Sequence, residues 1–184
     1  YNTQRLDREI DILKDTSDLV QDINIYVSDE KNTIFTSNND LFKLEKNITE
    51  LYSISDRTAV SYLPIENSYH FIMTYPESIP IKRAKYIIDI ELSNASIRNT
   101  LNQMYMGEAG LVLLASMDSS WFTTNMALEA EPSGSVSTLL SIVSEGKLYD
   151  SSIVLNNKKY LSYFEPFSDF NLVLISLYPE QNML

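Results

Sequence analysis

The chain has 184 residues, 44% of them hydrophobic, and a formal net charge of −11 at pH 7. This hydrophobic content is enough to bury a core, so the composition excludes a disordered chain. The acidity argues against binding to nucleic acid and against docking on an anionic membrane through a basic face. The chain has no cysteine and one histidine, which argues against a disulfide framework and against a zinc site.

A helical pattern opens the chain. Apolar residues recur at helical spacing between Gln4 and Leu19, with charged residues at the positions between them. Over residues 22–27 the pattern changes to a period of two, which predicts a strand. Turn-forming residues at 28–32 and a second strand-like segment at 33–36 then predict a hairpin.

A polar stretch with a weak helical pattern, residues 37–57, follows the hairpin. Three strand-like segments come next, at 59–63, 69–74 and 84–90. Pro76 and Pro80 fall between the last two segments, where they interrupt no strand. The first half therefore predicts a five-stranded antiparallel sheet with flanking helices.

The second half repeats this order of elements. Ser93 is a suitable N-cap for a second helix, and Asn156-Asn157 suits a tight hairpin turn because Asn tolerates a positive φ. The two halves differ in sequence, so the repeat is one of architecture. The expected strands are 110–115, 121–124, 152–155, 159–164 and 172–177, and the expected short helix is 136–143.

Three segments carry a resemblance to a known family. They are Asp22-Ile23-Asn24-Ile25-Tyr26-Val27-Ser28 after the first helix, Lys85-Tyr86-Ile87-Ile88-Asp89-Ile90-Glu91-Leu92-Ser93, and Tyr160-Leu161-Ser162-Tyr163-Phe164 with residues 172–179. In order and hydrophobic pattern the chain resembles the double Cache (dCache) family of bacterial extracytoplasmic sensors. It is most similar to the domains of YesM-like sensor histidine kinases.

The resemblance implies an α+β fold with a long N-terminal helix and two PAS-like lobes, each an antiparallel sheet with flanking helices. The implied parts are a signalling helix (1–21), a membrane-distal lobe (22–92), an interlobe helix (93–109) and a smaller membrane-proximal lobe (110–184). The implied function is non-catalytic: the extracellular ligand-sensing domain of a membrane receptor, foremost a two-component sensor histidine kinase. A membrane-bound AraC-type regulator, a chemoreceptor and an extracellular solute-capture protein stay open as alternatives.

The same resemblance sets the expected surroundings of the chain. Both ends of the sequence look cut from a longer chain. We therefore expect transmembrane helices on both sides of the domain in the parent protein, and the domain on the outer face of the membrane. The Asn, Ile, Tyr and Lys usage is typical of a low-GC, Gram-positive bacterium. We expect a homodimer through the N-terminal helix, a small molecule or a solute-binding protein as partner, and no cofactor.

The candidate ligand-binding residues lie in the first half. Tyrosine rings beside one cation suit a pocket, and an arginine can clamp a carboxylate. His70 shares a strand face with Ile72 and Thr74, where a hydrogen-bonded sheet histidine and a ligand-binding one both stay open. The candidates are Arg57, Tyr52, Tyr62, Tyr75 and His70.

The known amino-acid site of the family is not carried over. Amino-acid-sensing members place an Arg, a Trp-Tyr pair and an Asp in the distal pocket. The single tryptophan here is Trp121, in the second half, and Thr58-Ala59-Val60 follows Arg57 where aromatic residues belong. The four glycines form no phosphate-binding pattern, and no nucleophile elbow accompanies His70, so we expect no catalytic residue and no metal.

Overall fold

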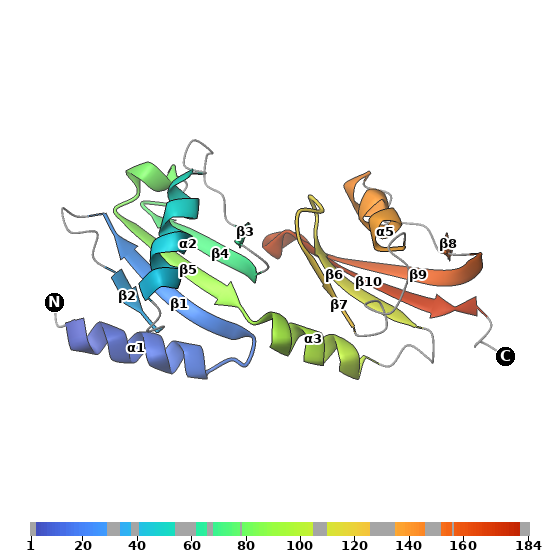
Figure 1. The fold of residues 1–184 in the computed structure, drawn as a ribbon, viewed down its shortest axis with the longest axis horizontal. Coiled ribbons are helices and arrows are strands. Elements are labelled where there is room, and N and C mark those ends of the chain that lie inside the picture. Colours follow the sequence, from blue (N-terminus) through green and yellow to red (C-terminus); the bar gives the residue numbers. More distant parts are fainter. Residues whose placement is uncertain are drawn as a thin grey trace. The chain divides into compact units, whose positions relative to one another are not determined.

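A computed structural model describes residues 3–28, 34–37, 41–53, 62–65, 68–77, 79–104, 110–125, 135–145, 152–155 and 157–180. The chain divides into two compact units, Tyr1–Asn94 and Ala95–Leu184. Each unit is an antiparallel sheet of five strands with helices beside it (Figure 1). The predicted α+β class and the two antiparallel sheets are therefore confirmed.

The first unit contains a sheet of strand order β2-β1-β5-β4-β3, in which neighbours pair antiparallel. The helix expected in the polar stretch is present as α2. The strands are β1 (Val20–Val27), β2 (Ile34–Thr36), β3 (Tyr62–Ile65), β4 (Ser68–Tyr75) and β5 (Tyr86–Leu92), and the helices are α1 (Thr3–Asp15), α2 (Leu41–Ser53) and the 3₁₀ turn η1 (Ile81–Arg83).

The N-terminal helix α1 is shorter than expected. It has 13 residues and ends at Asp15, so the expectation of a long helix continuing to Leu19 was wrong. Hydrogen bonds just after Asp15 explain why the helix ends there. The amides of Thr16 and Ser17 bond to carbonyls three residues back, and the Ser17 hydroxyl accepts a hydrogen bond from the Leu19 amide. Serine competes in this way with helical bonding, and β1 begins directly afterwards.

One face of the first sheet carries an apolar core at one end. Ile87 of β5 lies opposite Tyr26 of β1 on one side and Thr74 of β4 on the other. Because directly paired residues share a face of a sheet, these side chains point the same way. Leu51 of α2 packs in the same buried cluster. The cluster comprises Tyr26, Leu51, Ile65, Ile72, Ile81, Ala84 and Ile87.

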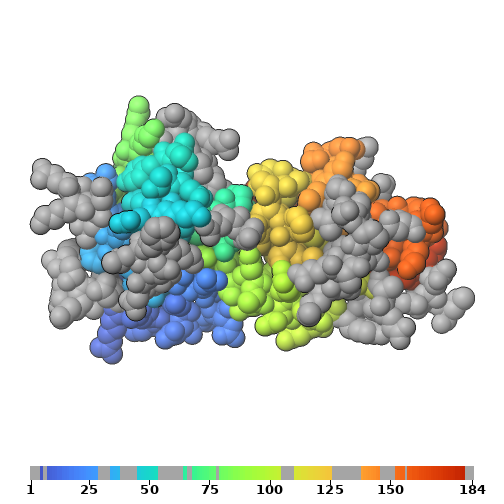
Figure 2. All heavy atoms as spheres, viewed as in Figure 1, coloured from blue at the N-terminus to red at the C-terminus, as the bar shows by residue number. Residues whose placement is uncertain are grey.

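Helix α2 therefore covers this face. In the ribbon it stands in front of the first sheet, and in the space-filling view it is the cyan layer over that unit (Figure 2). Burying a leucine such as Leu51 contributes about 1.5–3 kcal/mol relative to leaving it exposed. The helix thus holds its place by apolar contact.

The second unit repeats the strand order as β7-β6-β10-β9-β8. The architectural repeat predicted from the sequence is therefore confirmed strand for strand. The elements are α3 (Asn94–Gln103), β6 (Leu111–Ser116), β7 (Phe122–Thr124), α5 (Ser135–Ser144), β8 (Ser152–Leu155), β9 (Lys158–Phe167), the 3₁₀ turn η2 (Ser168–Phe170) and β10 (Leu172–Pro179).

The core of the second unit lies under α5. Leu139 and Val143 of this helix pack in a buried cluster with Val173 and Ile175 of the central strand β10. The expected hairpin turn between β8 and β9 is also present, since Asn157 has φ 62°. Within the described residues, no helix is long and apolar enough to span a membrane.

Candidate functional site

The polar end of the α2-covered face in the first sheet is the candidate site. Successive residues of a strand point to opposite faces, so Ile23 and Ile25 of β1 and Ile88 and Ile90 of β5 point to one face. The polar residues between them point to the other face, which they share with Tyr26 and Ile87. The polar set is nevertheless buried. Its members are Asp22 (4% exposed), Asn24 (1%), His70 (1%), Asp89 (0%) and Glu91 (2%), which we call the polar cluster.

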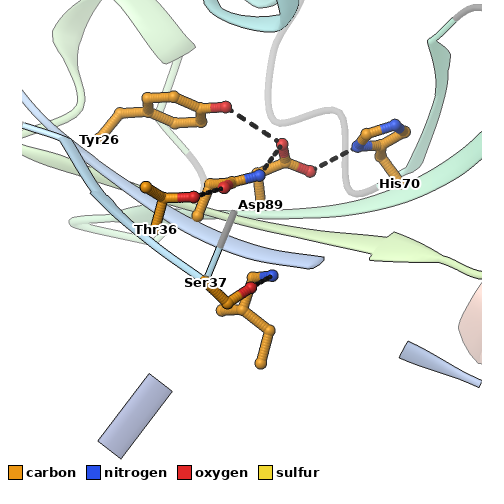
Figure 3. A network of polar contacts seen from close by, with 7 residues as sticks. Tyr26, Thr36, Ser37, His70 and Asp89 are labelled. Atoms are coloured by element: carbon orange, nitrogen blue, oxygen red, sulfur yellow. Dashed lines mark hydrogen bonds and ion pairs between the residues drawn. The ribbon is translucent and has the colours of Figure 1, made fainter. Parts of the chain in front are cut away.

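Asp89 lies at the centre of the polar cluster (Figure 3). Nδ1 of His70 lies 2.6 Å from its Oδ1. Its Oδ2 accepts hydrogen bonds from the Asn24 amide and the Tyr26 hydroxyl, each at 3.4 Å. The Thr36 hydroxyl donates to Oδ1 of Asn24 at 2.7 Å, which fixes the amide so that its nitrogen faces Asp89. Both carboxylate oxygens of Asp89 thus have partners from β1 and β4.

Two further carboxylates lie next to this centre. Glu91 is directly opposite Asp22 of β1 and directly opposite His70 of β4. Asp22 receives a hydrogen bond at 3.1 Å from Nζ of Lys14, in the last turn of α1. Three buried acidic side chains therefore share one region with one imidazole, and one lysine reaches it from α1.

The negative charge of the cluster acts on Tyr26. Burial raises the pKa of the Tyr26 hydroxyl well above its usual value, and the charge of Asp89 and the hydrogen bond to it raise the pKa further. Glu91 and Asp22 act in the same direction. The hydroxyl therefore stays protonated and acts as a donor to Asp89.

The chemistry of this arrangement suits binding. Among the described residues, no group of three or more His, Cys, Asp or Glu side chains has the geometry to hold a metal ion. Buried carboxylates seek hydrogen-bond donors and positive charge, so the cluster favours a donor-rich or cationic group over an anion.

The five residues predicted for the site have different places. His70 is inside the polar cluster, and Tyr52 of α2 packs against the apolar core at the other end of the same face. Tyr62 is a residue of β3 whose backbone pairs with Phe71. Tyr75 alternates to the face opposite His70, is 60% exposed and contacts the ring of Tyr86. Arg57 lies outside the described residues.

The sequence reasoning missed the polar cluster apart from His70. The signal was present, since Asp22, Asn24 and Tyr26 alternate with isoleucines on β1, and Asp89 and Glu91 alternate with isoleucines on β5. A polar alternate set normally faces solvent on an antiparallel sheet. Here the set is the better-buried one, and it shares its face with the apolar cluster on which α2 packs.

Comparisons with known proteins give the fold but no family. No family model matches the chain, and no curated protein matches it. Solved structures do match over almost its full length. The extracellular domain of rpHK1S-Z16, assigned as a histidine kinase, has a TM-score of 0.68 at 11% identity, with 98% of this chain and 79% of that chain covered.

Two further solved structures share this fold. The extracellular domain of mmHK1S-Z3, also assigned as a histidine kinase, has a TM-score of 0.59 at 8% identity, covering 99% of this chain and 81% of that one. The ligand-binding domain of the Campylobacter jejuni chemoreceptor Tlp3, in complex with 4-methylisoleucine, has a TM-score of 0.58 at 11% identity, covering 99% and 74%. The chain thus has the fold of dCache-type extracellular sensor domains.

Proposed function

We propose that this chain is the extracellular ligand-sensing domain of a bacterial membrane receptor. The observation that carries the proposal is the strand order, which is the same in both units and belongs to a fold found in several extracellular receptor domains. In such a receptor the domain is non-catalytic. It converts the presence of a ligand into a shift between two conformations of the parent protein.

The parent receptor that we propose is a two-component sensor histidine kinase with membrane helices on both sides of the domain. Several of the similar solved structures come from proteins assigned as histidine kinases, which favours this choice. A chemoreceptor is the second candidate because the Tlp3 domain has the same fold. The domain that follows in the parent gene decides between them.

The polar cluster is the proposed ligand site. Three buried carboxylates favour a ligand with an amine or several hydroxyl groups, and the Tlp3 domain was solved with 4-methylisoleucine, an amine-bearing molecule. His70 lies within the site, and Tyr52, Tyr62 and Arg57 are proposed as further contacts from the α2 side and its neighbours. Tyr75 is the weakest member of the set, since it alternates to the opposite face.

A thermal-shift screen against amines, amino acids, sugars and organic acids tests the proposal. A ligand at about 100 times its Kd adds about 2.7 kcal/mol to the free energy of unfolding, which raises the Tm by several degrees. The shift is expected to shrink in an Asp89→Asn variant and to persist in a Tyr75→Phe variant. A silent screen of folded protein contradicts small-molecule sensing, and points to a solute-binding protein as the partner.

A further inference from the structure

A row of charged side chains crosses the first sheet and ends on α1. Asp22, Glu91 and His70 occupy directly opposite positions on β1, β5 and β4. Directly opposite residues of antiparallel strands have Cβ atoms about 4.5–5.5 Å apart, so each side chain is the neighbour of the next. Lys14 bonds to Asp22 at one end, and His70 bonds to Asp89 at the other.

Two carboxylates lie in the middle of this row, between two side chains that can carry a positive charge. Its two middle members, Asp22 and Glu91, are both acidic and both buried. Like charges directly opposite each other destabilise a sheet, and burial strengthens their interaction. A cation-capable side chain stands at each end, and Asp22 and Glu91 also make further contacts. The negative potential that holds Lys14 therefore depends on the charge at His70.

Lys14 is placed to pass this dependence to α1. It lies in the last turn of the helix, one residue before the helix ends. A cation there also interacts favourably with the carbonyl end of the helix. The Lys14 side chain is 33% exposed and the Asp22 side chain 6% exposed, so the ion pair ties a surface helix to a buried carboxylate.

We propose that this row couples α1 to the His70 end of the polar cluster, so that a change of charge at His70 changes how tightly Lys14 holds α1. The biological meaning rests on the proposed sensing function, in which α1 leads toward the membrane. The coupling itself is a property of this chain and requires no ligand to be measured.

A set of double-mutant cycles tests the coupling. Lys14→Met is made in the wild-type, His70→Gln and Glu91→Gln backgrounds under one set of conditions. His70→Gln removes the side chain that can carry a positive charge at this end of the row, so Lys14→Met is expected to cost more there. Removing the anion at Glu91 makes the row less negative, so Lys14→Met is expected to cost less. Each departure from additivity is expected to be at least about threefold in the opening equilibrium constant.

Hydrogen exchange of individual amides is the suitable readout. The single tryptophan, Trp121, belongs to the second unit, so its fluorescence does not report on the first. Amides of β1 and β5 report the opening of the first sheet, and amides of the last turn of α1 report the coupling directly. Arg5→Met is the matched control, because Arg5 pairs with Glu9 on the same helix at 2.9 Å but both side chains are exposed.

Opposite signs in the two backgrounds, with additive behaviour for Arg5→Met, support the proposal. A general loosening of the unit gives the same sign in both backgrounds and overturns it, as do additive cycles. If His70→Gln does not fold, the Glu91→Gln arm decides alone: an unchanged cost of Lys14→Met overturns the proposal. A ligand found by thermal shift together with additive cycles rejects the coupling and leaves the sensing function standing.

Discussion

The hydroxyl of Tyr26 donates to Oδ2 of Asp89 at 3.4 Å, and the two side chains are 1% and 0% exposed. The pair joins the apolar and the polar halves of one sheet face, since Tyr26 also belongs to the apolar core cluster. A buried phenol beside a carboxylate makes the free energy of unfolding fall at high pH.

Tyr26→Phe is expected to weaken the fall in the free energy of unfolding at alkaline pH. The pKa of Tyr26 is raised in the folded state by burial and by Asp89. The contribution of the protonated Tyr26 hydroxyl to the free energy of unfolding is therefore fully present below pH 10 and is lost as the pH rises above 10. The wild-type slope above pH 10 is expected to exceed that of the variant by up to about 1.4 kcal/mol per pH unit. Urea denaturation followed by circular dichroism at pH 9, 10 and 11 measures it.

Tyr163→Phe is the control for this experiment. Tyr163 also bonds to a carboxylate, Glu165, and that hydrogen bond raises its pKa, but Tyr163 is 58% exposed. Because solvent screens the Glu165 charge at this exposed position, Tyr163→Phe is expected to change the slope much less than Tyr26→Phe does. Equal slopes for wild type and Tyr26→Phe would show that neither burial nor the Asp89 charge raises the pKa of Tyr26 in the folded state.

Asn24→Asp is expected to destabilise the first unit more than Asn24→Ala does. The alanine variant removes the amide donor to Asp89 and the acceptor for Thr36, at about 1–3 kcal/mol. The aspartate variant keeps the shape but places a fourth carboxylate opposite Asp89, so repulsion is added to the lost bond. Hydrogen exchange of β1 and β5 amides ranks the two, and a less damaging aspartate variant would contradict the charge assignment of the cluster.

The alternation of apolar residues predicted the strands well, and it failed for the site for one physical reason. The pattern at Ile23 and Ile25, or at Ile88 and Ile90, identifies two faces of a strand but does not say which face another element covers. That depends on α2, whose own pattern is weak. The sequence therefore predicted both sheets and α2, yet left Asp89 unnoticed, because nothing local marks a polar face as buried.

The boundaries that failed are those decided by side-chain hydrogen bonds. Leu13 and Leu19 extend the apolar pattern of α1, but the hydroxyls of Thr16 and Ser17 bond to nearby backbone and end the helix earlier. His70 was singled out because it is the single histidine, and its partner Asp89, 19 residues later in the chain, was not foreseen. Pairings across strands need the register, which the sequence pattern does not supply.

Asn157→Ala is expected to destabilise the second unit by about 1 kcal/mol, and Asn157→Gly to be neutral or slightly stabilising. Asn157 has φ 62° in the turn between β8 and β9, a conformation that costs alanine about 1–2 kcal/mol but glycine little. Unfolding followed by Trp121 fluorescence reports on this unit. If both variants were equally destabilised, the side-chain amide rather than the backbone angle would be the important feature.

Ser116→Ala is expected to loosen the turn that holds Trp121. The Trp121 amide donates to the Ser116 hydroxyl at 2.9 Å, and that hydroxyl also contacts the Trp121 carbonyl at 3.2 Å. Both residues are buried, so a lost partner costs about 1–3 kcal/mol. A red-shifted Trp121 emission and a lower urea midpoint are expected. Ser144→Ala, at an exposed helix end, is the control and is expected to change neither.

The two sides of α1 are expected to respond differently to truncation. Ile10 is 2% exposed, so Ile10→Ala removes core contacts and costs about 2–4 kcal/mol. Leu13 is 56% exposed, so Leu13→Ala is expected to change the stability of the first unit by less than about 0.5 kcal/mol. Hydrogen exchange of β1 measures both. A large cost at Leu13 would mean that this side chain is covered by its own lobe.

The exposed side of α1 is the proposed contact of a homodimer. Ile12 and Leu13 are 53% and 56% exposed on adjacent positions of the helix, and parallel packing against a second copy would bury them. Ile12→Glu and Leu13→Glu are expected to weaken association at least tenfold in equilibrium sedimentation, with little change in Tm. Met73→Glu, at an exposed residue of β4, is the control and is expected to leave association unchanged. A wild-type chain that stays monomeric at high concentration would contradict a dimer contact on α1.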